Sequence, residues 1–322
     1  MAITTEETFE RLAETHRRGI HAHCYRMLGS LHDAEDAYQE AMLRAWRSLP
    51  RLREDAAARA WLYRIATNVC LNAIARRPRR VLPADYGPAW SVADHPGEPA
   101  EESLWLEPYP DSDLDSGYAA PDARYEQREA VELAFVAALQ HLPAQQRAVL
   151  ILRDVLGFSA AESAESLETS SAAVNSALQR ARRTVEERLP ERSQQATLRA
   201  LGDQRSRELL HGYLDAWERK DIPAIVSMLT EDVIGDMPPW PMWFQGRATI
   251  EELLRSDHGE CYEAWRYVPV GANGQLAFAA YGLKDGRFEP ASITVLTVRD
   301  DLISVGTAFV LPALFPRFGV PA

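Results

Sequence analysis

The chain has 322 residues, of which 46% are hydrophobic, and this is enough to form two or three folded domains. Its 47 acidic and 35 basic residues give a net charge of −12, a balance that by itself argues against a nucleic-acid partner. The charge is segregated, however, because residues 1–80 carry 14 bases and 10 acids, whereas residues 81–130 carry 2 bases and 12 acids. A basic N-terminal part followed by an acidic middle part indicates separate structural units.

Three cysteines, Cys24, Cys70 and Cys261, lie far apart and form no CxxC pair. This usage indicates neither a disulfide framework nor a cysteine-based zinc site, and it is typical of the reducing cytoplasm. The N-terminal residues are polar and acidic, unlike a signal peptide, and the uncharged run Tyr267–Leu283 is interrupted by Pro269 and by glycines. We therefore expect a cytoplasmic protein with no membrane segment, no bound metal and no cofactor.

Composition divides the chain into four predicted segments. Residues 81–125 contain seven prolines, ten acids and one base, with no sustained helical or strand period, which is typical of a linker that is largely unstructured on its own. The pattern on either side is helical. The predicted segments are a helical domain at 1–82, an acidic, proline-rich linker at 83–125, a second helical domain at 126–192 and a further domain at 200–322.

The last segment has the pattern of an α+β domain. Helical periodicity covers residues 204–219, 222–229 and 248–256. Turn signals at Asn273-Gly274, Asp285-Gly286 and Asp300-Asp301 separate strands predicted near 263–271, 275–283, 287–299 and 302–310. Strands joined by such short turns form an antiparallel meander.

A predicted helix that begins near Asp33, its expected N-cap, has two distinct faces. Alanines recur at helical spacing together with Met42 and Trp46 and form the apolar stripe. The other face carries Glu35, Asp36, Gln39, Glu40, Leu43 and Arg47. The pattern alone leaves open whether this second face is simply a solvated helix surface.

The next predicted helix, at 56–75, combines an apolar stripe with a polar one. Its expected buried residues are Trp61, Leu62, Ile65 and Val69, and its polar stripe is Arg64, Asn68, Asn72 and Arg76. Arginine neutralises phosphate and asparagine can read base edges, so this stripe suits a helix that lies along DNA. Arg77, Arg79 and Arg80 extend the basic end, although such a cluster also occurs on ordinary solvated surfaces.

These two helices carry a resemblance to a known family. The stretches DAEDAYQEAMLRAWRSL and RAWLYRIATNVCLNAIARR are similar to region 2 of extracytoplasmic-function sigma factors, the small promoter-recognition subunits of bacterial RNA polymerase. The family's acidic helix docks on the clamp helices of the polymerase β′ subunit. The resemblance therefore implies polymerase contacts by Asp33, Asp36, Gln39, Glu40 and Leu43.

The same resemblance assigns the next helix and the loop before it to opening of the minus-ten promoter element. It implies contacts with the minus-ten strand by Arg64, Asn68 and Asn72, and contacts with backbone phosphate by Arg76, Arg77, Arg79 and Arg80. The residues from Arg53 to Arg59 lie where the family places a pocket for an unstacked base, but the sequence identifies no pocket residue there.

The second helical domain has helix-turn-helix spacing between Leu142 and Leu189. Ser159 with Glu162 predicts a capping box for a short helix, and a longer helix from Ser170 is expected to bury Val174, Leu178, Ala181 and Val185. Outward positions suited to the major groove are Ser171, Asn175, Gln179, Arg182 and Arg183. Pattern alone also allows a generic small bundle. The stretch LPAQQRAVLILRDVLGFSAAESAESLETSSAAVNSALQRAR resembles region 4 of the same family, which implies recognition of the minus-thirty-five element.

One residue departs from the usual helix-turn-helix pattern. Glu168 lies in the turn, where glycine is frequent. If its backbone is left-handed, glutamate costs about 1 kcal/mol relative to glycine, which the fold should tolerate.

The linker contains a motif that is unusual for a disordered segment, because Trp105 and Tyr109 lie close to Pro108. Our hypothesis is that this motif docks on the C-terminal domain. The linker's acidity has two interpretations. It is either a passive tether or, as the resemblance implies, a segment that threads the positively charged channel of the polymerase.

The C-terminal domain resembles the SnoaL-like cone fold through LHGYLDAWERKDIPAIVSMLTEDV, FQGRATIEELL and TAFVLPALFPRFGVPA. Candidate pocket residues combine apolar bulk with an acid and a base. They are Trp217, Asp236, Trp240, Trp243, His258 and Tyr281. Proton transfer by Asp236 and His258, sensing of a small ligand, and a purely packing or regulatory role all remain open.

The sequence thus predicts a multidomain protein with two all-α sigma domains and an α+β SnoaL-like cone with an antiparallel sheet. We interpret it as a sigma factor, not an enzyme. It is expected to bind core RNA polymerase through the β′ clamp helices and the β flap, and to bind both promoter elements, with the C-terminal domain regulating activity in cis. The alternatives are a repressor using the helix-turn-helix alone, and a DNA-binding protein fused to a SnoaL-like cyclase, isomerase or small-ligand sensor. The sequence does not show whether a separate anti-sigma protein exists.

Overall fold

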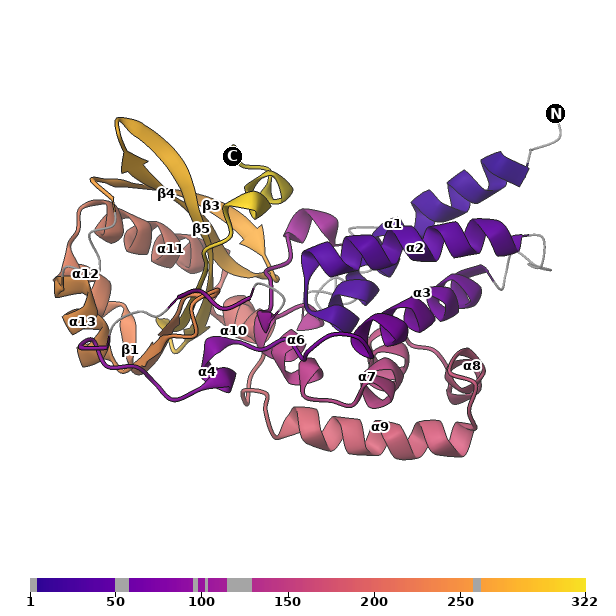
Figure 1. Cartoon of the computed structure of the whole chain (residues 1–322). Helices are drawn as coiled ribbons and strands as arrows, with labels where there is room; N and C mark the ends of the chain where they lie inside the picture. The colour runs from indigo at the N-terminus through magenta and orange to yellow at the C-terminus, as the bar shows by residue number, and fades with distance from the viewer. Residues whose placement is uncertain (1–4, 50–57, 95–97, 102–103, 115–128, 257–261) are drawn as a thin grey trace. The chain divides into compact units, whose positions relative to one another are not determined.

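The computed structural model describes residues 5–49, 58–94, 98–101, 104–114, 129–256 and 262–322 (Figure 1). The chain forms two compact units, and each is assembled from two separate stretches of sequence. The first unit contains residues 1–80 and 113–190, and the second contains residues 81–112 and 191–322. Within the described residues, no helix is both long and apolar enough to cross a membrane.

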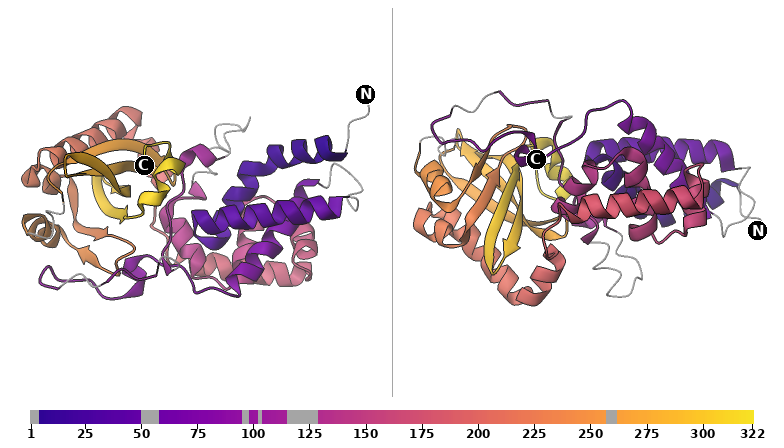
Figure 2. Two further views of the ribbon diagram at one scale, coloured as in Figure 1. Left: turned by 45° about the horizontal axis from the view of Figure 1, so that its top comes forward. Right: turned by 90° about the horizontal axis from the view of Figure 1, so that it is seen from below.

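Three helices form the N-terminal part of the first unit: α1 (Thr5–Leu28), α2 (Leu31–Ser48) and α3 (Ala58–Ile74). They lie side by side in Figures 1 and 2 and pack through small residues of α2, since Ala34, Ala37, Ala41 and Ala45 are all buried. The N-cap of α2 is Ser30 rather than the expected Asp33, because the Ser30 hydroxyl accepts a hydrogen bond from the Asp33 backbone N–H at 3.1 Å. This leaves the Asp33 carboxylate for another role.

The second helical group of this unit follows the predicted helix-turn-helix pattern. It contains α6 (Leu133–Gln140), α7 (Ala144–Leu150), a π-helical continuation η5 (Ile151–Val155), α8 (Ala160–Ser166) and α9 (Ser171–Glu186). The expected capping box is present, since Ser159 and Glu162 exchange side-chain to backbone hydrogen bonds. Glu168 has a φ of 52°, so its backbone is left-handed, which is the condition under which glutamate costs about 1 kcal/mol relative to glycine.

The second unit is an α+β fold around one six-stranded sheet. Its helices are α4 (Pro83–Tyr86), α10 (Gln194–Leu201), α11 (Asp203–Glu218), α12 (Ile222–Ser227) and α13 (Arg247–Arg255), with a 3-10 segment η7 (Pro312–Phe318). Its strands are β1 (Leu229–Asp236), β2 (Trp243–Gln245), β3 (Trp265–Ala272), β4 (Gln275–Lys284), β5 (Arg287–Arg299) and β6 (Leu302–Phe309).

The sheet differs from the expected antiparallel arrangement at one strand pair. The strand order is β2-β1-β6-β5-β4-β3, and β1 pairs with β6 in parallel while the other pairs are antiparallel. The meander from β3 to β6 agrees with the predicted strands. At its first turn, Asn273 and Gly274 both have positive φ values, 54° and 66°, as a two-residue hairpin of the mirror-image type requires.

The two faces of the sheet have separate cores. On one face, α11 packs through Tyr213 and Leu214 against Phe278 and Leu296. On the other face, Phe315 of η7 packs against neighbouring strands. Because registered neighbours across strands share a face, each side chain of the sheet can be assigned to one of these two cores.

The acidic segment predicted to be an unstructured linker is in part folded. Residues 81–112 belong to the second unit, and the side chains of Trp105, Leu106 and Tyr109 are at most 1% exposed. Val81 pairs with the same segment, since it donates to the Leu104 carbonyl and accepts from the Leu106 N–H. Residues 95–97, 102–103 and 115–125 of the predicted linker lie outside the described residues, and so do residues 50–57, which include most of the stretch from Arg53 to Arg59.

Candidate promoter and polymerase interface

The outward face of α2 presents most of the residues expected to contact the polymerase. Asp36, Gln39 and Leu43 are exposed, with Leu43 at 52%, and Glu40 forms an ion pair with Arg44 at 2.6 Å. Single exposed apolar side chains are common on protein surfaces, whereas contiguous apolar patches often mark interfaces. This face therefore combines carboxylates with an exposed leucine.

Trp46 differs from its prediction. The sequence pattern placed it in the buried stripe of α2, but its side chain is 44% exposed and meets the Phe9 ring edge to face at 5.2 Å. The spacing from Leu43 to Trp46 is three residues, so helical geometry puts the two side chains on neighbouring positions of the outer face. Because the sequence had already placed Leu43 on the outer face, this spacing could have predicted that Trp46 is also a surface residue.

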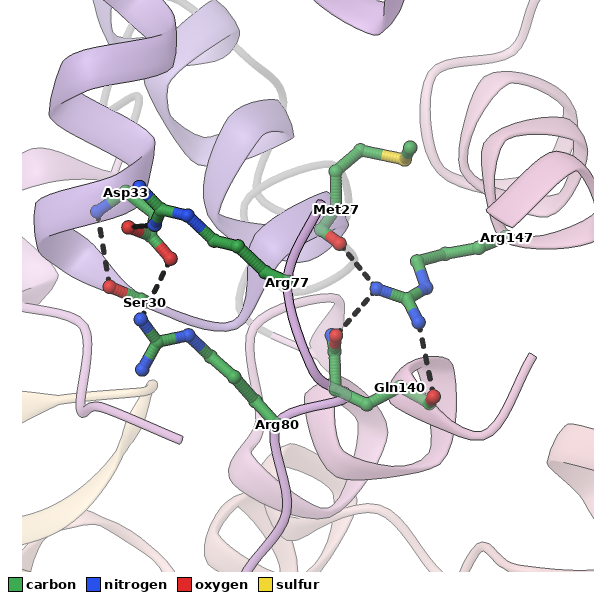
Figure 3. A network of polar contacts seen from close by, with 7 residues as sticks. All are labelled: Met27, Ser30, Asp33, Arg77, Arg80, Gln140 and Arg147. Atoms are coloured by element: carbon green, nitrogen blue, oxygen red, sulfur yellow. Dashed lines mark hydrogen bonds and ion pairs between the residues drawn. The ribbon is translucent and has the colours of Figure 1, made fainter. Parts of the chain in front are cut away.

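Asp33 does not belong to this exposed face. Its side chain is buried and accepts from Arg80 at 2.7 Å, while Arg77 forms a second ion pair with it. Figure 3 shows the carboxylate held between the two guanidinium groups. Asp33, which was expected to contact the polymerase, thus pairs with two arginines that were expected to contact DNA, and Asp33 and Arg80 are both buried in the first unit.

The polar stripe on α3 is present over three of its four expected members. Arg64 and Asn68 are half-buried and Asn72 is exposed. Because α3 ends at Ile74, Arg76 lies beyond the helix, where Arg76, Arg77 and Arg79 are exposed. Leu62 and Val69 are buried as expected, whereas Trp61 and Ile65 are only half-buried.

Acidic residues of the helix-turn-helix face Arg64 in the first unit. Its guanidinium lies 3.8 Å from the Glu165 carboxylate and 3.4 Å from that of Glu168. Nearby, Arg59 donates to the Leu156 carbonyl at 2.7 Å and lies over the Phe158 ring. DNA contact by Arg64 therefore requires that phosphate or bases replace these carboxylates.

The outward face of α9 carries all five residues expected at the minus-thirty-five element. Ser171, Asn175, Gln179, Arg182 and Arg183 are all exposed. The buried residues of the helix are those that its periodicity predicted, Val174, Leu178, Ala181 and Val185. Two of the outward arginines have partners on the protein. Arg182 makes a two-pronged ion pair with Asp154 at 2.7 and 2.8 Å, which raises the pKa of its guanidinium, and Arg183 pairs with Glu187.

Comparison with known proteins matches these helices to the family models of two sigma regions. Residues 12–80 match Sigma-70 region 2, and residues 132–185 match Sigma-70 region 4. The chain is 43% identical over 319 residues to the ECF RNA polymerase sigma factor SigG of Mycobacterium tuberculosis strain H37Rv, covering 97% of this chain and 84% of that relative. The chain belongs to the extracytoplasmic-function (ECF) sigma factors.

A second relative is similar to this ECF sigma factor over both units, in sequence and in structure. The ECF RNA polymerase sigma factor SigJ of M. tuberculosis is 30% identical over 304 residues, covering 89% of this chain and 86% of the relative. The crystal structure of M. tuberculosis SigJ superposes with a TM-score of 0.60 at 23% identity, covering 96% of this chain and 98% of that chain. The fold of the sigma factor is thus two sigma helical regions followed by a SnoaL-like α+β domain with a mixed sheet.

The residues expected to line one pocket of the SnoaL-like domain are distributed over both faces of its sheet. Trp217 packs in the core under α11, whereas Tyr281 packs against Phe315 on the opposite face and donates to the Pro321 carbonyl at 2.8 Å. Trp240 is half-buried near β2, and His258 lies outside the described residues. Proton transfer between Asp236 and His258, one of the alternatives that the sequence left open, is therefore not tested by the described residues.

Asp236 lies on the face of the sheet against which Phe315 of η7 packs. It is paired in register with Trp243 on β2 and Thr307 on β6, and the same row continues through Val295. Its side chain is only 3% exposed. Burial, opposed by the Thr307 hydroxyl and reinforced by the charge of Asp85, raises the pKa of Asp236 to about 7.

The linker segment passes this part of the sheet and contacts it through backbone groups. The Trp243 indole donates to the Gly87 carbonyl at 2.8 Å, and the Trp90 N–H donates to the Trp243 carbonyl at 2.8 Å. The Ala100 N–H donates to the Pro239 carbonyl at 3.0 Å. Asp85 of α4 is close enough to affect Asp236 electrostatically.

The motif that contains Trp105, Pro108 and Tyr109 is seated on the turn between β3 and β4. Asn273 and Tyr109 exchange two hydrogen bonds, because the Asn273 N–H donates to the Tyr109 carbonyl at 2.8 Å and the Tyr109 N–H donates to Asn273 Oδ1 at 2.9 Å. The Gly274 N–H donates to Asp111 Oδ1 at 2.7 Å. The linker motif therefore contacts the C-terminal domain within the second unit, as hypothesised from the sequence, and the surface that it contacts is the predicted Asn273-Gly274 hairpin turn.

Proposed function

We propose that this ECF sigma factor binds core RNA polymerase, recognises the minus-thirty-five and minus-ten promoter elements, and promotes transcription initiation. The observation that carries the proposal is the match of both sigma regions on one chain that is similar to SigG over most of its length. The exposed faces of α2 and α9 support it, because they hold the residue types that a polymerase partner and a DNA groove require. Its partners are core polymerase and promoter DNA, which places its activity in the cytoplasm.

The proposed polymerase contacts are Asp36, Gln39, Glu40 and Leu43, with Trp46 as an addition. Leu43→Glu should weaken binding to purified core polymerase at least tenfold, because it places a charge at the exposed apolar centre of the face. Arg11→Glu on α1, which also adds an acidic residue at an exposed helical position, is the control and should bind normally. Equal loss of binding in both variants would remove α2 from the interface.

The proposed promoter contacts divide into two sets that one experiment separates. Arg64, Asn68 and Asn72 act on the minus-ten strand, so their alanine variants should initiate poorly on duplex promoter and regain activity on a template already opened at that element. Asn175→Ala on α9 should not be rescued by the open template, because it acts on duplex DNA at the minus-thirty-five element. Rescue of both sets, or of neither, would contradict this division of roles.

The second unit is proposed to regulate transcription in cis through the seated linker. Trp105→Ala should release the linker from the β3–β4 turn and change the rate of initiation in a reconstituted assay, whereas unchanged initiation would remove the linker from regulation. A truncation after Pro190 compared with the full chain gives the sign of the effect.

We also propose that the chain is not an enzyme. The alternative, a DNA-binding protein fused to a SnoaL-like cyclase, isomerase or ligand sensor, draws on the buried carboxyl of Asp236. Turnover of a substrate that is abolished by Asp236→Asn would favour that alternative.

A further inference from the structure

A cavity of about 380 Å³ lies within the first unit, where the end of α3 meets the junction of α6 and α7. Its walls come from both sigma regions, since Arg77, Arg79 and Arg80 follow α3 and His141 and Arg147 belong to the second helical group. The volume is at the lower end of the range of small-molecule sites, which run from about 300 to 1,000 Å³.

The described walls of this cavity are strongly basic. They include four arginines, and the acidic side chain among them is that of Asp33. Asp33 is already shared by Arg77 and Arg80, so its single negative charge is divided between two cations. Among the residues that the structure describes, neither Arg79 nor Arg147 forms an ion pair with a carboxylate, so another anion could balance their charge.

Arg147 is buried among oxygen atoms that carry no full charge. Its guanidinium donates to the Met27 carbonyl at 2.5 Å, to Gln140 Oε1 at 2.5 Å and to the Gln140 carbonyl at 3.0 Å, as Figure 3 shows. A further hydrogen bond reaches the Leu142 carbonyl at 3.3 Å. Its Nε is buried and makes no hydrogen bond. Burial accordingly lowers the pKa of Arg147 to about 10.

Arg79 of the cavity wall shares His141 with Arg188, an arginine that does not line the cavity. Arg79 lies 3.2 Å from His141 Nδ1, and Arg188 lies 3.3 Å from His141 Nε2. A neutral imidazole carries one N–H, so only one of its nitrogens can accept from an arginine. A bound anion beside Arg79 would offer that guanidinium an acceptor that His141 cannot fully supply.

We propose that this cavity binds a small ligand that carries a phosphate or pyrophosphate group. Arginine forks match the geometry of phosphate oxygens, and charge-assisted hydrogen bonds of this kind are about twice as strong as neutral ones. The cavity has room for a mononucleotide or a sugar phosphate rather than for a duplex.

A ligand there would contact both sigma regions at once. It would stabilise their packing in the first unit and would engage Arg77 and Arg79, which are also proposed to hold promoter phosphate. This consequence for promoter binding rests on the proposed function, whereas binding of the ligand itself does not. The shared chemistry is a phosphate group, supplied either by a free ligand or by the nucleic-acid backbone.

Calorimetric titration of the full chain with pyrophosphate, adenosine monophosphate and adenosine tests the proposal. Pyrophosphate and adenosine monophosphate should bind at one site per chain, and adenosine should not. Arg79→Gln should weaken binding about tenfold, the effect of losing one charge-assisted hydrogen bond. Arg76→Gln is the matched control, because Arg76 is exposed, lies three residues earlier and does not line the cavity.

Three outcomes would overturn the proposal. The first is no binding of pyrophosphate or adenosine monophosphate. The second is equal weakening by Arg76→Gln and Arg79→Gln, which would indicate diffuse surface attraction. The third is Arg79-dependent binding of a single-stranded promoter oligonucleotide without binding of either small phosphate, which would assign the arginines to nucleic acid alone. Promoter-dependent transcription, measured separately, reports on the proposed function whichever result is obtained.

Discussion

Replacing Asp236 with asparagine should remove a pH-dependent loss of stability from the second unit. An aspartate in an unfolded chain has a pKa of about 3.9, whereas burial raises the pKa of folded Asp236 to about 7. Below about pH 4 the carboxyl is protonated in both states, so it adds no penalty. Between about pH 4 and pH 7 the unfolded state loses its proton while the folded state keeps it, and folding becomes less favourable.

The size of the effect follows from the shift. Three pKa units correspond to roughly 4 kcal/mol, so the free energy of unfolding should fall by up to that amount between pH 4 and pH 7 relative to Asp236→Asn. Above about pH 7 the two proteins should differ by a constant amount. Taking the difference between the two proteins cancels the titration of groups that they share.

The assay is denaturant unfolding of both full-length proteins at a series of pH values from 4 to 9. Asp232→Asn is the matched control on the same strand. Asp232 is exposed, and the Arg299 guanidinium lowers its pKa, so its contribution has the opposite sign and is lost as the pH falls. A difference between wild type and Asp236→Asn that does not change from pH 4 to pH 8 would refute the assignment of a buried, neutral carboxyl.

Three other predictions follow from buried or strained positions. Trp105→Ala removes a side chain that is 1% exposed and should lower the free energy of unfolding of the second unit by about 3–5 kcal/mol. Hydrogen exchange at the Asn273 and Gly274 amides should become faster, and unchanged exchange there would contradict the hydrogen bonds between the linker and the β3–β4 turn. Glu168→Gly relieves a left-handed φ of 52° and should stabilise the first unit by up to about 1 kcal/mol, since the exposed ion pairs that it loses are worth little; a lower melting temperature would contradict this. Arg147→Gln leaves buried carbonyls without their donor and should destabilise the first unit by about 3 kcal/mol, measured by denaturant unfolding; a change below 1 kcal/mol would show that other donors replace it.

Local patterns predicted the elements well. Val174 and Leu178 of α9 are buried because their spacing fixes one face of a helix, and the Asn273-Gly274 turn forms because both residues tolerate positive φ. The parallel pairing of β1 with β6 was not predicted, since it joins strands that are far apart in the chain and leaves no short-range signal.

The candidate site was predictable only in part. Exposure of Leu43 follows from helical period, but the burial of Asp33 does not, because it depends on Arg77 and Arg80 arriving from beyond the end of α3. The scatter of the expected SnoaL-like pocket residues has a similar cause. Side-chain type suggested a shared cavity for Trp217 and Tyr281, whereas Trp217 of α11 packs in the core on one face of the sheet and Tyr281 of β4 packs in the core on the other.

The interleaving of the two units restricts how this architecture can be shortened or inherited. Residues 81–112 leave the first unit to pack in the second, and the chain then returns at residue 113. A truncation after Pro190 therefore deletes residues 191–322 but keeps residues 81–112, which pack against them. The side chains of Trp105, Leu106 and Tyr109 would then form an exposed apolar surface on the remaining fragment. Loss of the C-terminal domain during evolution should therefore be accompanied by substitution of these three apolar residues. We expect the two stretches of sequence to be gained, changed and lost together.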